Sequence, residues 1–301
     1  MKKQIEEMYE KQKNRRIKAI VTGLFAFAIT MGIVSAFLGN PFPHKETWLI
    51  IETTIPGWIY TDGYLLCFCG VAGVFAGTVN IVSSILNPFR NLDQVLLQEC
   101  DAKHYLELME YAVTYGKGLK WRWIGLQKTV LLLAEQKYVL ALIANQRFEE
   151  AECYLNKGWI GKRGSRLFRQ TAMNLELAQK YADEDVENFC KALQSAGKEF
   201  TKNQLLTAKE FMLRRDYEAA LELLADREEK TPYSEVGRKF LLGKCYDELG
   251  DQSQAIAYME FVAEHGNTMP HKAWAQEWLG RKTVFLLEQE NLNGKKEQND
   301  D

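Results

Sequence analysis

The sequence predicts an all-α protein in which a two-helix transmembrane hairpin is followed by a cytoplasmic α-solenoid of helix pairs. Three observations support this fold class. Two long segments near the N-terminus, residues 19–38 and 63–86, contain no charged residue. Beyond them, apolar residues recur every three or four positions, which is typical of helices and not of strands. Towards the C-terminus, one pattern of helices and turns occurs twice at an offset of 35 residues.

The overall composition excludes few classes of protein. The chain has 301 residues, of which 47% are hydrophobic and 26% are charged, as in ordinary globular proteins. Its formal net charge of −2 provides no general attraction for nucleic acid, so we expect no nucleic-acid partner. The six cysteines show no paired spacing, and we expect buried thiols rather than disulfides.

The N-terminal region combines a basic segment with the first predicted span. Residues 19–38 would form a helix of about 30 Å, which matches the hydrocarbon core of a bilayer. Because Lys and Arg are enriched on the inner side of a membrane, residues 1–18 are predicted to be cytoplasmic. The basic residues of this segment are Lys2, Lys3, Lys11, Lys13, Arg15, Arg16 and Lys18.

The connector and the second span complete the predicted hairpin. Residues 39–62 contain a single basic residue, Lys45, and are therefore predicted to be external. The second span, residues 63–86, returns the chain to the inside, which places both termini in the cytoplasm and the protein in a bacterial inner membrane. As an alternative, Val34-Ser35-Ala36 resembles the cleavage site of a secretory signal peptide.

Small residues recur every four positions in both spans. Such stripes allow helix backbones to approach closely in lipid. They would pair the two spans in a hairpin or, alternatively, support a homodimer. Neither span contains Asp, Glu, Lys, Arg or His, which favours an anchor over an ion or proton pathway. The residues of the stripes are Ala28, Gly32 and Ala36 in the first span, and Cys69, Gly73 and Gly77 in the second.

The remainder of the chain, residues 87–290, is predicted to be a cytoplasmic helical domain, and residues 291–301 a disordered tail. A stop signal, Asn87-Pro88, lies at the start of the domain. The expected helices lie mostly in pairs: 92–115, with a break near Asp101; 119–144 with 148–156; 166–181 with 186–196; 204–213 with 217–227; 235–249 with 252–264; and a last helix at 271–289.

The internal repeat is clearest between residues 201 and 270. Arg215-Asp216-Tyr217 aligns with Gly250-Asp251-Gln252 at the offset of 35 residues. The small residues Ala208 and Gly243 keep this offset, as do the aromatic residues Phe211 and Tyr246.

These residues resemble the tetratricopeptide repeat (TPR) family, whose 34-residue unit has a small residue in each helix where the two helices cross. Residues 236–269 match best, through Leu242-Gly243-x-x-Tyr246 and through Ala255 with Met259. Residues 201–234 match through Ala208 and Ala220 and depart from the pattern at Gln204 and Thr207. Earlier copies are degenerate, and residues 271–289 would cap the array.

The resemblance implies a superhelix whose concave groove binds a peptide or a protein. Lysines in that groove would suit an acidic segment or a free carboxylate, although members of the family with a carboxylate clamp have Asn where this chain has Lys209 and Lys244. A solvated lysine face is the alternative. The implied groove residues are Lys202, Leu205, Lys209 and Met212 from one copy, and Phe240, Lys244 and Asp247 from the next.

A second basic cluster lies between two of the helix pairs. Lys157, Lys162, Arg163, Arg166 and Arg169 surround Trp159 and three glycines. The pattern G-x-x-x-x-G-K-[ST] is absent, so we do not expect nucleotide binding. Contact with an anionic partner or with the inner leaflet is one interpretation, and an ordinary loop between repeats is the other.

No catalytic signature is present in the sequence. The four histidines form no spaced pair, and the motifs H-E-x-x-H, C-x-x-C and G-x-S-x-G are absent. We therefore predict neither an enzyme, nor a metal site, nor a cofactor. The sequence favours a membrane-anchored adaptor with an unidentified protein or peptide partner. The alternative is an accessory subunit of a membrane transport or envelope-assembly complex, in which the spans make the main contacts.

Overall fold

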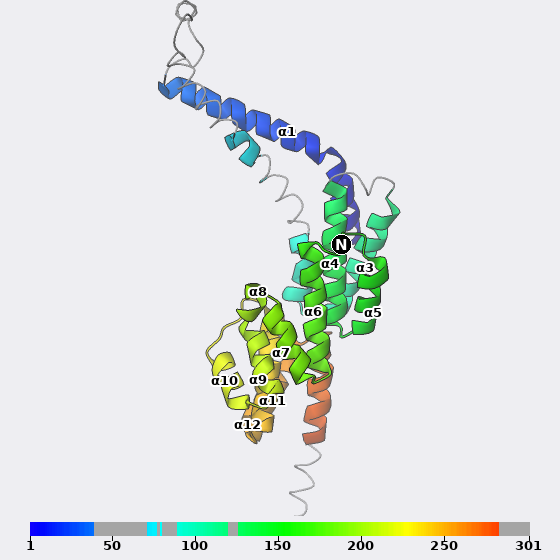
Figure 1. Cartoon of the computed structure of the whole chain (residues 1–301), viewed down its shortest axis with the longest axis vertical. Coiled ribbons are helices and arrows are strands. Elements are labelled where there is room, and N and C mark those ends of the chain that lie inside the picture. Colours follow the sequence, from blue (N-terminus) through cyan, green and yellow to red (C-terminus); the bar gives the residue numbers. More distant parts are fainter. Residues whose placement is uncertain (39–70, 77–78, 80–88, 120–125, 283–301) are drawn as a thin grey trace, which may run out of the picture. The chain divides into compact units, whose positions relative to one another are not determined.

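The computed structural model describes residues 1–38, 71–76, 79, 89–119 and 126–282. The chain divides into two compact units: unit 1 comprises residues 1–2, 91–119 and 131–301, and unit 2 comprises residues 3–90 and 120–130. Within the described ranges the regular structure is entirely helical, without any strand (Figure 1). The all-α prediction is therefore confirmed for this part of the chain.

Unit 2 contains most of the long helix α1, Lys2–Leu38. The basic segment and the first apolar run thus form one continuous helix, as expected. Among the described residues, no helix combines the length and the apolarity that crossing a membrane requires. The transmembrane hairpin therefore stays a prediction. The connector 39–62, most of 63–86 including Gly77, and the tail 291–301 lie outside the described residues.

Unit 1 consists of consecutive helices, most of them paired. The pairs α6 with α7, α9 with α10 and α11 with α12 agree with the predicted pairs to within three residues at each end. The helix bounds are α3 Ala102–Gly118, α4 Leu126–Ala144, α5 Phe148–Cys153, the π-helix η2 Tyr154–Gly158, α6 Arg166–Ala182, α7 Val186–Ser195, α8 Lys198–Thr201, α9 Gln204–Leu213, α10 Tyr217–Ala225, α11 Pro232–Glu248 and α12 Gln252–His265. Residues 126–130 of α4 belong to unit 2.

A recurring turn starts four of these helices. In each turn an Asp at the N-cap accepts a hydrogen bond from the backbone N–H three residues later, which satisfies one of the unpaired donors of the first helical turn. The residue before each Asp has a positive φ, between 53° and 85°. The four pairs are Cys100-Asp101, Glu184-Asp185, Arg215-Asp216 and Gly250-Asp251.

Helix α11 begins three residues earlier than the sequence predicted. Thr231 is its N-cap, and the Thr231 side chain accepts a hydrogen bond from the backbone N–H of Ser234. Pro232 occupies the first helical position, where its missing N–H would have no intrahelical partner. The sequence pattern places the start of this helix at residue 235, whereas Pro232 starts it.

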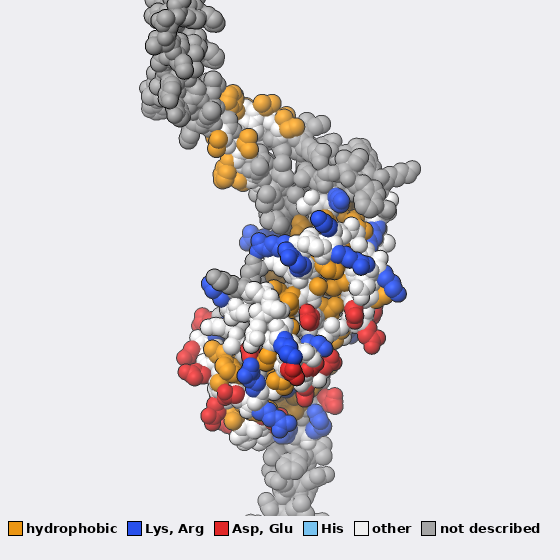
Figure 2. Space-filling view, viewed as in Figure 1, with side chains coloured by type: hydrophobic (Ala, Val, Ile, Leu, Met, Phe, Trp, Pro, Cys, Tyr) orange, Lys and Arg blue, Asp and Glu red, His pale blue; other side chains and the backbone are white. Residues whose placement is uncertain are grey.

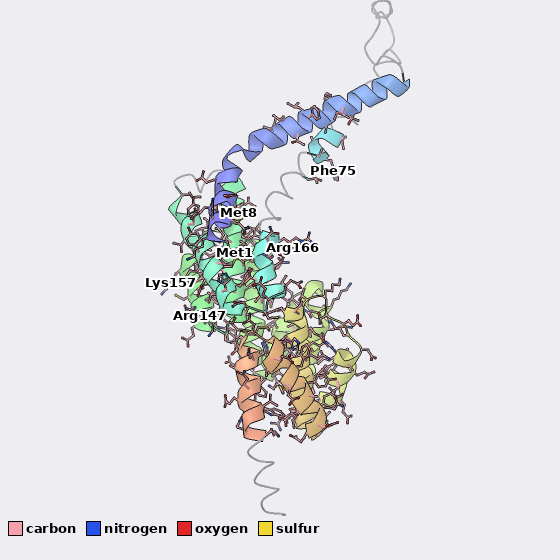
Figure 3. The ribbon with its side chains drawn as sticks, turned by 180° about the vertical axis from the view of Figure 1, so that it is seen from behind. Met1, Met8, Phe75, Arg147, Lys157 and Arg166 are labelled. Atoms are coloured by element: carbon pink, nitrogen blue, oxygen red, sulfur yellow. The ribbon has the colours of Figure 1, made fainter. Side chains whose placement is uncertain are left out.

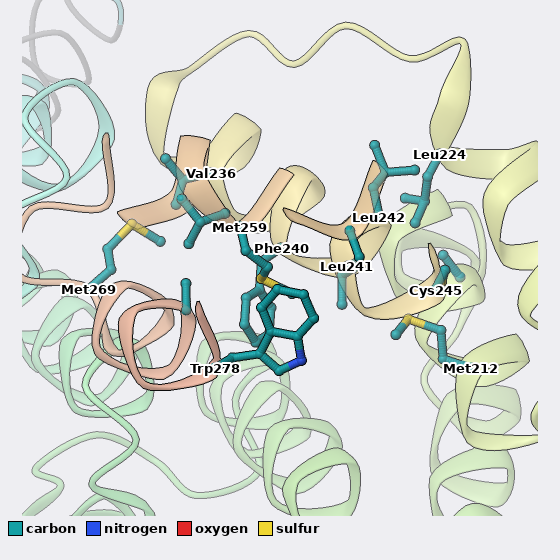
Figure 4. Close-up of a cluster of buried hydrophobic side chains, with 14 of the residues drawn as sticks. Met212, Leu224, Val236, Phe240, Leu241, Leu242, Cys245, Met259, Met269 and Trp278 are labelled. Atoms are coloured by element: carbon teal, nitrogen blue, oxygen red, sulfur yellow. The ribbon is translucent and has the colours of Figure 1, made fainter. Parts of the chain in front are cut away.

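The main core of unit 1 forms where α9 to α12 cross (Figure 4). Ala208, Ala220 and Ala255 are completely buried. A Cβ atom added to Gly243 would lie 2.8 Å from Cε of Met259, so a larger residue at this position would require the buried Met259 side chain to shift. Small residues therefore mark the helix crossings, as the resemblance implied.

Two turns of unit 1 that are far apart in the sequence also meet. The side-chain amide of Asn267 donates to the carbonyl oxygen of Glu99 at 2.8 Å, and the hydroxyl of Thr268 donates to Oδ1 of Asp101 at 2.7 Å. The backbone N–H of Lys103 donates to the same hydroxyl at 3.0 Å. The turn before α3 thus packs on the turn after α12, a contact that the expected superhelix with its concave groove did not include.

Residues 270–282 form a further helix that packs on the last pair. Ala275 and Trp278 belong to the same buried cluster as Phe240 and Met259. The expected last helix, 271–289, thus exists up to residue 282, and its remainder lies beyond the described residues.

Candidate functional site

The residues of the implied groove differ in accessibility. Lys202 is exposed, and Leu205 is half-buried against the core. Met212 and Phe240 are buried, with 7% and 9% of their surface exposed, so the expectation that they line an accessible groove is wrong. The physical reason is that the predicted exposed face of α11 is covered: His271 and Trp274 pack edge-on against the ring of Phe240.

Asp247, the third predicted groove residue of α11, is engaged within the fold. Its carboxylate accepts hydrogen bonds from Nε1 of Trp278 at 2.8 Å and from Nε2 of Gln252 at 3.1 Å, and it forms an ion pair with Lys282. Burial opposes ionisation of this carboxyl, but these partners outweigh it and lower its pKa. Asp247 therefore serves to hold the helix 270–282 against α11.

Lys209 and Lys244 are the two groove residues with unusual electrostatics. Both are half-buried, and each ammonium lies over an aromatic ring: Lys209 Nζ is 4.6 Å from the ring centroid of Tyr181, and Lys244 Nζ is 5.7 Å from that of Trp274. Burial and the charge of Lys244 lower the pKa of Lys209 to about 8. Neither lysine forms a salt bridge or hydrogen bond with any residue that the structure describes.

His271 adds a third basic group to these lysines. Its Nδ1 is buried and has no hydrogen-bond partner among the described residues. Burial and the charges of Lys209 and Lys244 lower its pKa to about 4. Sequence reasoning missed His271 as a site residue, because its neighbours come from helices far away in the sequence. We call Lys209, Lys244 and His271 the lysine face.

The second basic cluster, residues 157–169, lies on η2, on the loop that follows it and on the first turn of α6. Its five cationic side chains are exposed. Lys157 and Arg166 are labelled in Figure 3. Lys and Arg side chains, without Asp or Glu among them, gather over the upper parts of α3 to α6 in Figure 2.

The small-residue stripes are only partly within the described residues. Gly73 is buried, and a Cβ atom on it would lie 2.8 Å from the carbonyl oxygen of Gly23 and 3.3 Å from Cβ of Phe27. Gly73 therefore packs against α1 at Gly23, whereas Ala28 of the predicted stripe is exposed. For Gly32 and Ala36 the structure describes the helix but not the side chains.

Within the described ranges, no group of three or more His, Cys, Asp and Glu side chains is arranged to bind a metal ion. The expectations of no enzyme, no metal and no cofactor stay predictions from the sequence.

Within the described residues, the fold and the lysine face define a helical protein of stacked helix pairs with a partly buried basic surface that has no salt bridge. Comparisons with protein-family models, with curated proteins and with solved structures gave no match. The resemblance to TPR proteins therefore stays a prediction that is based on the repeat in the sequence.

Proposed function

We propose that the protein is a membrane-anchored adaptor of the bacterial inner membrane, whose TPR-like solenoid binds an acidic segment of a protein partner in the cytoplasm. The observation that carries this proposal is the absence of a carboxylate partner for Lys209 and Lys244 among the described residues. Moving a cation out of water costs free energy unless a counter-charge is present. A ligand with carboxylate groups would supply that counter-charge.

The aromatic rings beside the two lysines support the same interpretation. Tyr181 and Trp274 attract the ammonium groups through their ring faces, which holds the charges in place without neutralising them. Each lysine keeps its hydrogen-bond donors for a ligand. His271 adds no charge to the face near pH 7, because its lowered pKa leaves it unprotonated.

Support for the membrane anchor comes from unit 2. Nine large apolar side chains of α1 and of residues 71–79 are between 46% and 68% exposed. Soluble monomers rarely expose contiguous apolar patches of this kind. A lipid environment would cover them. The exposed side chains are Ile20, Val21, Leu24, Phe25, Ile29, Val71, Val74, Phe75 and Val79.

Photo-crosslinking in cells tests the adaptor. A photoreactive amino acid is placed at Lys202, the exposed residue of the predicted groove, in the full chain. We expect a defined protein adduct that is lost in the double variant Lys209→Met with Lys244→Met, because methionine keeps most of the side-chain length without the charge.

The matched control is Lys239→Met. Lys239 also lies on α11, is half-buried and sits over aromatic rings, but its ammonium pairs with Glu235 at 3.7 Å. The adduct should persist in this variant. An adduct that survives in the double variant, or no adduct from Lys202, would contradict the proposed function.

The second candidate function, an accessory subunit that acts through its spans, is favoured by the close approach of Gly23 and Gly73. Helices that pack through glycines can also bind the helices of other membrane proteins. Replacing residues 1–86 with an unrelated anchor separates the two functions. If the adduct from Lys202 disappears although unit 1 is folded, the accessory-subunit function is correct and the adaptor is not.

A further inference from the structure

We propose that residues 157–169, here called the basic segment, form a docking surface for the anionic headgroups of a phospholipid bilayer. This surface is distinct from the lysine face. The proposal rests on the membrane location in the proposed function, but not on the nature of the protein partner.

The charge of the segment is strongly one-sided. Between residues 153 and 175 the chain contains five Lys or Arg residues and no Asp or Glu. All five side chains are exposed. Two of them, Arg166 and Arg169, lie in the first turn of α6, which contains no acidic residue. The positive end of the helix dipole therefore adds to their charge instead of offsetting it.

The segment is fixed to the rest of unit 1 by a buried polar network. Glu135, which is completely buried, accepts a hydrogen bond from the hydroxyl of Tyr154 at 2.8 Å and another from the backbone N–H of Ile160 at 3.1 Å. Lys117 pairs with Glu135 at 3.1 Å and donates to the carbonyl oxygen of Gly158 at 2.7 Å. These contacts hold both the end of η2 and the start of the loop.

Two glycines allow the loop to lie close to this network. A Cβ atom on Gly158 would lie 2.7 Å from Cδ2 of Tyr154. A Cβ atom on Gly161 would lie 2.6 Å from Cδ2 of Leu132. Trp159 packs edge-on against Phe168 of α6 at 5.6 Å between ring centroids. The cations are therefore presented by a packed segment, so little conformational entropy of the backbone is lost when they meet a ligand.

A bilayer surface fits these features better than other anionic ligands. Small ligands bind in concave sites that bury most of their surface, whereas these cations are exposed and distributed along a loop and a helical turn. Nucleic-acid-binding domains usually carry a large positive charge, but the net charge of this chain is −2. The proposed function places the chain at a membrane, where exposed clusters of Lys and Arg bind anionic lipids.

Amide hydrogen exchange of the full chain tests the proposal. The chain is reconstituted in nanodiscs of phosphatidylcholine alone and in nanodiscs that also contain phosphatidylglycerol. We expect exchange within the basic segment to slow by at least about tenfold in the anionic discs. Added salt should reverse this protection, because it screens exposed charges. Equal exchange in both kinds of disc would overturn the proposal.

A matched pair of triple variants makes the test specific. The first combines Lys157→Gln, Lys162→Gln and Arg169→Gln. The second removes the same charge from exposed positions elsewhere: Lys103→Gln, Lys230→Gln and Arg281→Gln. Protection should be lost only in the first triple variant, while exchange in α11 and α12 stays unchanged in both. If the control triple abolishes the protection as well, general electrostatic attraction explains the result and the proposal fails.

Poly-glutamate, added to the chain in phosphatidylcholine discs, tests whether the basic segment binds an acidic protein instead of lipid. If poly-glutamate protects the segment and phosphatidylglycerol does not, the surface binds acidic protein and the lipid proposal is wrong. A chain that does not enter nanodiscs at all would instead contradict the membrane anchor of the proposed function. The two failures are therefore distinguishable.

Discussion

At the scale of single residues, Lys209 and Lys244 carry charges that the described fold leaves without a counter-ion. For Lys209 the consequence is measurable. Its folded pKa of about 8 is below the ordinary value of 10.5, so the unfolded chain binds more protons between these pH values. The charged Lys209 side chain therefore lowers the stability of the folded protein below about pH 8. This penalty decreases as the pH rises and is absent above pH 10.5.

We therefore predict that Lys209→Met stabilises the protein at pH 7 and raises its free energy of unfolding by on the order of 1 kcal/mol. The gain should shrink as the pH rises from 8 to 10.5. Denaturant unfolding of the full chain at several pH values measures it. Lys239→Met, which removes a lysine paired with Glu235, should give no such gain. A Lys209→Met variant that is less stable than the wild type would show that the charge is compensated.

His271 leads to a prediction for acidic pH. Its pKa falls from 6.5 to about 4 on folding, so the unfolded chain takes up the proton first as the pH is lowered. We predict that wild-type stability decreases relative to His271→Phe between pH 6.5 and about 4. Gly237→Ala changes no titratable group, so it is the control and should show a constant difference. A constant difference for His271→Phe as well would contradict the burial of an unpartnered imidazole.

At the scale of elements, α11 packs against α12 at a glycine, Gly243. Gly243→Ala places a Cβ atom 2.8 Å from the completely buried Met259, and we expect it to lower the free energy of unfolding by about 1–3 kcal/mol. Gly237 lies on the same helix, and a Cβ atom there would meet nothing within 4 Å. Gly237→Ala should raise the free energy of unfolding by about 0.5–1 kcal/mol, because alanine favours a helix. If both variants change the free energy of unfolding in the same direction, the close packing of α11 on α12 at Gly243 is contradicted.

The sequence was most informative about the individual helices. Helix α9 was predicted with its observed bounds, and the small residues Ala208 and Gly243 lie at helix crossings. Periodicity and turn residues are local signals, so they can be read without knowing the tertiary contacts. The predicted start of α11, residue 235, is three residues late because Pro232, which is disfavoured inside a helix, occupies its first position.

The site was harder to predict than the helices. Met212 and Phe240 occupy positions that are exposed in an isolated helix pair, but later parts of the chain cover Phe240. The contact of Asn267 and Thr268 with the turn before α3 joins residues about 165 positions apart. No periodic pattern in the sequence encodes such a contact. The basic nature of the face, by contrast, was visible in Lys209 and Lys244.

At the scale of the whole molecule, the proposed anchor makes a prediction about topology. The basic residues of segment 1–18 predict that the N-terminus is inside, and two spans would return the chain to the same side. A tag after Asp301 should therefore react with an impermeant reagent only after the cells are opened. Labelling in intact cells would contradict the orientation. A tag at Lys45, in the connector, is the complementary control and should be labelled in intact cells.

The central claim is that Lys209 and Lys244 bind an acidic ligand. A peptide-display selection on the purified full chain tests this claim most directly. Wild type, Lys239→Met and the double variant Lys209→Met with Lys244→Met are compared with one random-peptide library. We predict that wild type and Lys239→Met enrich peptides rich in Asp and Glu, and that the double variant loses this enrichment. Selected peptides without acidic residues, or the same peptides on the double variant, would contradict the claim.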